Sequence, residues 1–133
     1  MKKLKYFFLV TDISFIFYWT ITLLHLIPEQ LLFKDYANPI LESWNWSFFP
    51  LDILISLTGL VSLYLYSKGK ERWRVISLLS LTLTFCSGLQ AISFWVLQKD
   101  FDLTWWIPNL YLIIYPLFFI KGLVKSLTEA KNH

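Results

Sequence analysis

The feature that most constrains this chain is the apolar run at residues 6–27, YFFLVTDISFIFYWTITLLHLI. About 20 helical residues, rising about 1.5 Å each, cross the roughly 30 Å hydrocarbon core of a bilayer. The run is therefore long enough to be a membrane span, yet it contains Asp12 in its first half and His25 near its end. A charge at such depth costs at least about 2.5 to 3.5 kcal/mol. Both side chains are therefore expected to face protein, water or a ligand rather than lipid.

Composition also indicates a membrane protein. Of the 133 residues, 56% are hydrophobic and 16% charged, which leaves too little polar surface to cover a soluble domain of this size. The net charge of +3 does not indicate nucleic-acid binding, because no basic cluster adjoins a soluble region that could present it to phosphates. Cys86 is the only cysteine, so an intrachain disulfide and a cysteine-based metal cluster are excluded. We predict no metal site and no cofactor.

The chain is expected to form one transmembrane domain over residues 1–133. The first run exceeds the roughly 7 to 15 apolar residues of a signal peptide and lacks a small-residue cleavage site, so we interpret it as an uncleaved span. The sequence thus predicts an all-α membrane protein, a four-transmembrane-helix bundle, with a long connection at residues 28–46 whose tryptophans suit the membrane interface. The predicted spans are residues 6–27, 47–67, 75–97 and 103–120.

Basic residues are concentrated at one end of this predicted bundle. The opposite connections carry only Lys34 and Lys99. By the positive-inside rule, both termini are expected in the cytoplasm and residues 28–46 outside, in a multi-pass protein of the cell membrane. The ten cations on the cytoplasmic side are Lys2, Lys3, Lys5, Lys68, Lys70, Arg72, Arg74, Lys121, Lys125 and Lys131.

Polar side chains from three predicted spans reach one depth. Counting about 1.5 Å per residue from the midpoint of each span places Asp52, Gln90 and Asn109 about 4 to 8 Å to the exterior side of the midplane. Asp12 falls on the cytoplasmic side, about 14 Å from Asp52 along the membrane normal by the same rise, so the two acids are not expected to form a pair. His25 lies about one turn beyond Asp52. Candidates for the walls of a pocket at this level are Trp95, Trp105 and Trp106.

Each of these residues also has a purely structural interpretation. Serines and threonines at helical spacing often serve only to pack helices, and tryptophans often anchor a protein at the interface. Asp52 is accounted for structurally if it pairs with a polar neighbour, and Asp12 if it reaches cytoplasmic water. Intramembrane acids are nevertheless functional by default, so we predict that Asp52 handles a ligand or a proton and that Asp12 is a candidate for proton coupling.

Three segments carry a resemblance to a known family: WNWSFFPLD at residues 44–52, CSGLQAISFW at 86–95 and WWIPNLYLIIYPLFF at 105–119. Over nearly its whole length the chain resembles the YvaD-like family of uncharacterised four-helix bacterial membrane proteins. The resemblance implies four spans in a bacterial plasma membrane and implies no activity.

A fainter likeness is to the emopamil-binding-protein superfamily, whose members have four or more spans and bind sterols or cationic amphiphiles within the membrane. This likeness implies that Asp52 corresponds to an outer-half acid on the second helix, and His25 to a polar residue on the first. Some members carry a second acid where His25 stands, which weighs against isomerase chemistry.

Three functions stay open on the sequence. The first is binding of a hydrophobic, sterol-like or cationic amphiphilic molecule, with or without chemistry, in an outer-leaflet pocket centred on Asp52. The second is a proton-coupled small multidrug exporter with Asp12 as its essential acid, although the one-sided charge distribution weighs against it. The third is an accessory subunit that packs against a larger partner membrane protein. A homo-oligomer is the other candidate assembly. The residues do not decide whether the protein is an enzyme.

Overall fold

The chain forms four long helices in the computed structural model, which describes residues 1–28, 32 and 35–132. All four are long and apolar enough to cross a membrane. This confirms the predicted all-α, four-helix membrane protein. The helices are α1 (Lys2–Leu23), α2 (Pro39–Ser67), α3 (Trp73–Leu97) and α4 (Leu103–Lys131).

Helix ends differ from the predicted spans where capping residues set them. The side chain of Asn38 accepts a hydrogen bond from the Ile40 amide at 3.0 Å, and Pro39 occupies the first turn, where its missing amide proton has no cost. Residues 39–46 are therefore the start of α2 rather than part of the predicted connection, and Pro50 lies inside the helix. Residues 29–31 and 33–34 of the predicted connection lie outside the described part of the chain.

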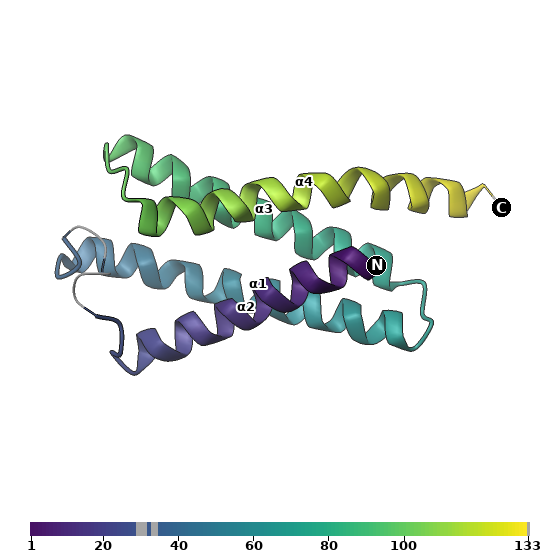
Figure 1. The fold of residues 1–133 in the computed structure, drawn as a ribbon, viewed down its shortest axis with the longest axis horizontal. Helices are drawn as coiled ribbons and strands as arrows, with labels where there is room; N and C mark the ends of the chain where they lie inside the picture. Colours follow the sequence, from purple (N-terminus) through teal and green to yellow (C-terminus); the bar gives the residue numbers. More distant parts are fainter. Residues whose placement is uncertain (29–31, 33–34, 133) are drawn as a thin grey trace.

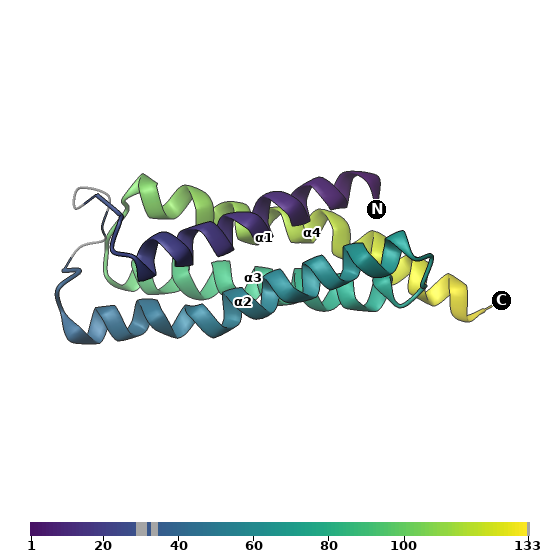
Figure 2. The ribbon, with the colours of Figure 1, turned by 90° about the horizontal axis from the view of Figure 1, so that it is seen from below.

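The two termini lie at the same end of the bundle (Figure 1). The connection between α2 and α3 lies there too, and we call this the terminal end. The opposite end, which holds the other two connections, is called the loop end. Each helix packs most extensively on its neighbour in sequence. Helices α1 and α4 approach each other at the terminal end and diverge toward the loop end (Figures 1 and 2).

Small hydroxyl residues connect the neighbouring helices. Ser56 on α2 donates to the carbonyl oxygen of Asp12 on α1 at 3.0 Å. Ser80 on α3 donates to the carbonyl oxygen of Ile55 at 3.2 Å, and Ser62 and Ser77 share a buried hydrogen bond. The packing interpretation of these serines is therefore confirmed, as expected where small residues let transmembrane helices approach closely.

The first and last helices meet at the terminal end through large side chains. The ring of Phe7 on α1 stacks on Tyr115 of α4, with 5.1 Å between ring centroids. Through this stack, Phe7 packs against the buried core, which consists of Leu4, Phe8, Leu81, Leu112, Tyr115 and Leu123. The rings of Phe7, Tyr111 and Tyr115 fill the space between α1 and the middle of α4, and the cavity described next lies on the loop-end side of them.

Candidate functional site: a pocket between the first and last helices

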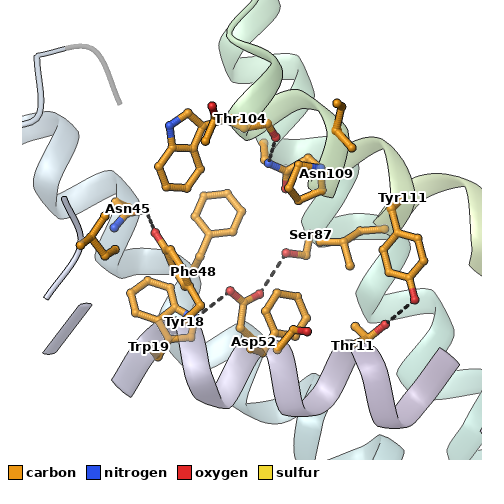
Figure 3. Close-up of a pocket in the computed structure, with 18 of the residues that line it drawn as sticks. Thr11, Tyr18, Trp19, Asn45, Phe48, Asp52, Ser87, Thr104, Asn109 and Tyr111 are labelled. Carbon is orange, nitrogen blue, oxygen red and sulfur yellow. Dashed lines mark hydrogen bonds between the residues drawn. The ribbon is translucent and has the colours of Figure 1, made fainter. Parts of the chain in front are cut away.

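A cavity of about 660 Å³ lies toward the loop end, with walls from all four helices (Figure 3). Its volume falls within the roughly 300 to 1,000 Å³ of small-molecule sites. Val10 of α1 and Ile107 of α4 line its edges, and their side chains are 59% and 62% exposed. Part of the cavity wall therefore lies at the exposed surface of α1 and α4.

Asp52 forms part of the inner wall of the cavity. It projects from α2, only 5% of its surface is exposed, and its two carboxylate oxygens have different partners. The indole Nε1 of Trp19 on α1 donates to Oδ2 at 2.9 Å, and the hydroxyl of Ser87 on α3 donates to Oδ1 at 3.1 Å (Figure 3). A carboxylate oxygen accepts more than one hydrogen bond, so two neutral donors leave Asp52 capacity for a further partner.

Aromatic rings surround this carboxylate toward the loop end. Tyr18 packs edge-on against Trp19, with centroids 4.9 Å apart, and against Trp105 of α4 at 6.1 Å. Its hydroxyl also donates to the Asn45 side-chain oxygen at 3.3 Å, which ties α1 to α2. Aromatic faces attract cations as well as apolar groups. The pocket thus joins one acid to a largely apolar, ring-lined volume.

The opposite limit of the pocket is a polar contact between α1 and α4. The hydroxyls of Thr11 and Tyr111 lie 3.1 Å apart in a hydrogen bond, and both residues line the cavity (Figure 3). Beyond this pair the ring stack of Phe7 fills the space between the same two helices. The pocket is therefore closed toward the terminal end.

Four of the predicted site residues line the cavity: Asp52, Trp95, Trp105 and Asn109. The Asn109 amide does not pair with Asp52, however. The Asn109 amide nitrogen donates to the carbonyl oxygen of Trp105 at 2.7 Å, within its own helix. The acid is held by an indole and a hydroxyl instead.

The other three predicted residues lie elsewhere. His25 is exposed after the end of α1, with a backbone φ of 55° that turns the chain away. Gln90 is exposed on α3, whose inward face carries Ser87 and Ala91. The indole of Trp106 donates to the carbonyl oxygen of Asp100 at 2.7 Å in the connection before α4. Counting residues along a helix gives depth but not the direction of a side chain, so it could not show that Gln90 lies outside the cavity.

The two donors to Asp52 were absent from the predicted site. Ser87 stands at helical spacing after Ser77, Ser80 and Thr84, a stripe that predicts an inward face but was equally typical of simple packing. Trp19 lies at the level of the predicted pocket but belongs to the first span. To place it beside Asp52, one must know how α1 is rotated about its axis relative to α2, and this could not be predicted from the sequence.

Asp12 occupies a separate place on α1. Its side chain is fully buried, and among the described residues neither carboxylate oxygen has a hydrogen-bond partner. The carboxylate packs directly against Gly59 of α2, where an added Cβ would overlap it. The structural alternative, in which Asp12 reaches cytoplasmic water, is therefore wrong: the absence of a side chain at Gly59 lets α1 and α2 close over the carboxylate.

Comparison with known proteins supplies the family. A family model described as a family of unknown function (DUF5360) matches residues 4–130, nearly the whole chain. The chain belongs to this family. It is also 58% identical over 132 residues to the uncharacterized protein YvaD of Bacillus subtilis (strain 168), and the alignment covers 99% of each chain. No solved structure matches. The predicted YvaD-like resemblance is confirmed, and these relatives carry no stated activity.

Proposed function

We propose that this protein binds a hydrophobic or cationic amphiphilic molecule in the pocket between α1 and α4. One observation carries the proposal: a buried carboxylate, Asp52, forms part of the wall of a cavity that is otherwise lined largely by aromatic and apolar side chains. The apolar body of the ligand lies against the rings, and its positive group lies beside Asp52.

A positive group suits this wall on energetic grounds. Burying an ionised carboxylate is costly unless it is paired as well as hydrogen-bonded. Only neutral donors, Trp19 and Ser87, are seen on Asp52, and the ion pairs among the described residues lie at Arg74 and Lys125, far along the chain near the terminal end. A ligand cation would supply the missing charge while the surrounding rings attract it further.

Exposed apolar lining residues support an amphiphile rather than a small water-soluble cation. Val10 of α1 and Ile107 of α4 line the cavity and are exposed, so in our proposal a molecule dissolved in the bilayer enters between these two helices. The exporter alternative has less support. Asp12 does not line the cavity and is covered by Gly59, so the proton site and the cation site that such an exporter couples are not joined.

Two ions of nearly identical shape and opposite charge test the proposal. The full chain in nanodiscs is titrated with tetraphenylphosphonium and with tetraphenylborate. We expect Asp52→Asn to weaken phosphonium binding at least tenfold, equivalent to about 1.4 kcal/mol, and to leave borate binding unweakened. Glu42→Gln makes the same acid-to-amide change on an exposed part of α2 and should leave both affinities within about twofold. Equal phosphonium binding by wild type and Asp52→Asn would rule the proposal out.

We further propose that both termini are cytoplasmic, which places the pocket in the outer half of a bacterial cell membrane. The excess of basic residues at the terminal end supports this orientation. Topology reporters inserted at Lys70 or fused after the last residue should report the cytoplasm, and a reporter at Asn38 should report the exterior. A reporter at Lys70 that reads exterior would reverse the orientation and move the pocket to the inner leaflet.

A further inference from the structure

A second cavity lies at the terminal end, apart from the Asp52 pocket. It measures about 360 Å³ and is bounded by the first turns of α1 and α3 and by the later turns of α4. Its wall is apolar over Leu4, Phe119 and Leu123, and it carries a charged side chain, Arg74, from the start of α3. An apolar wall with one guanidinium suits a molecule that has both an apolar chain and an anionic group.

The charge of this end favours an anion. The segments at the terminal end that carry the ten cations contain two acids, Glu71 and Glu129. Both acids are already paired, Glu71 with Arg74 and Glu129 with Lys125 at 3.7 Å. The cation excess therefore remains after the local pairs have formed.

Arg74 is placed to bind a phosphate. Its guanidinium lies over the ring of Trp73, 5.2 Å from the ring centroid, which holds it against the start of α3. The side chain is 25% exposed, while that of its partner Glu71 is 75% exposed and able to turn to water. A guanidinium has five N–H donors in a planar fork, so it engages a phosphate oxygen without releasing every existing contact.

The side of the cavity formed by α4 has room for an acyl chain. A Cβ added at Gly122 would meet no atom within 4 Å. One turn earlier, Phe118 also lines the cavity and is 77% exposed, so this wall continues onto the lipid-facing surface of α4. A lipid chain lying on α4 would therefore reach from the bilayer into the cavity.

We propose that this cavity binds an anionic phospholipid, with its phosphate on Arg74 and one acyl chain along α4 past Gly122. Basic pockets between transmembrane helices at the headgroup level are suited to anionic lipids. The proposal does not depend on the Asp52 pocket.

Two lipids with identical chains test it. The full chain in detergent is titrated with dioleoylphosphatidylglycerol and with dioleoylphosphatidylcholine, and bound lipid is counted by native mass spectrometry. We expect phosphatidylglycerol to bind at least tenfold more tightly than phosphatidylcholine, and Arg74→Gln to remove most of that preference. Lys131→Gln removes one charge from α4 outside the cavity and should change binding less than twofold. No preference in wild type, or an equal loss in Lys131→Gln, would overturn the proposal.

Gly122→Leu provides a test that does not alter charge. Gly122 lines the cavity and a Cβ added there would meet no atom within 4 Å, so we expect a leucine to narrow the cavity, with thermal stability held and phosphatidylglycerol binding about tenfold weaker. Unchanged lipid binding in this variant would refute the cavity as the site even if Arg74→Gln failed to fold. Millimolar inorganic phosphate should not displace the lipid, and displacement would show that the acyl chain contributes nothing.

Discussion

Replacing Gly59 with alanine is expected to destabilise the bundle by about 1 to 3 kcal/mol, the typical cost of overpacking in a filled interior. The three nearest atoms to an added Cβ all belong to the carboxylate of Asp12. Asp12 is fully buried and cannot turn into solvent, so α1 must move away from α2. Removing the carboxylate removes the obstacle. Asp12→Ala in the same chain should therefore recover most of the lost stability.

Thermal unfolding in detergent measures this double-mutant cycle. The coupling free energy between positions 12 and 59 should approach the full destabilisation caused by Gly59→Ala, because the three atoms nearest the added Cβ all belong to Asp12. Gly122→Ala is the matched control, since it makes the same change within a helix where nothing stands within 4 Å, and it should not lower the melting temperature. A Gly59→Ala protein that is equally unstable with and without Asp12 would show that another contact sets the α1–α2 distance.

Replacing Ser14 with tryptophan is expected to weaken binding of both tetraphenylphosphonium and tetraphenylborate at least tenfold. Ser14 lines the pocket from α1 and is itself exposed, so an indole there would occupy the opening without displacing the core. The effect is steric and should not depend on the sign of the charge. This separates it from Asp52→Asn, which should affect the cation alone.

Equilibrium binding in nanodiscs measures the effect, with thermal unfolding as a check on the fold. Ser93→Trp is the matched control: Ser93 is exposed on α3 and does not line the cavity, so both ions should bind as they do to wild type. Unimpaired binding in a folded Ser14→Trp protein would place the ions outside this pocket.

Much of the fold followed from the sequence because hydrophobic length alone specifies a span. Each apolar run became a helix, and the Asp102 side chain caps α4 by accepting from the Thr104 amide at 2.9 Å. The start of α2 was missed because Asn38-Pro39 is typical of a turn as well as of a helix N-terminus. The helix extension to Lys131 was missed because hydrophobicity ends at the membrane while a helix does not.

The site was predicted less completely than the fold. Asp52 was expected to be buried and inward-facing, and it is, because an acid at membrane depth has few alternatives. Its partners depend on how each helix is rotated about its axis. Gln90 and Ser87 lie within one turn of α3, yet only Ser87 faces the acid. Packing between helices determines these rotations, so they cannot be predicted by counting residues along a single helix.

The central claim is that an amphiphilic cation occupies the pocket with its charge beside Asp52. A crystal structure of the chain bound to a bromophenyl-substituted tetraphenylphosphonium tests it directly through the anomalous signal of bromine. We expect the bromine peaks between α1 and α4 toward the loop end, and the phosphorus within about 6 Å of the Asp52 carboxylate, the range over which opposite charges stabilise each other. Bromine found only on the lipid-facing surfaces of the helices, with the pocket empty, would contradict the claim.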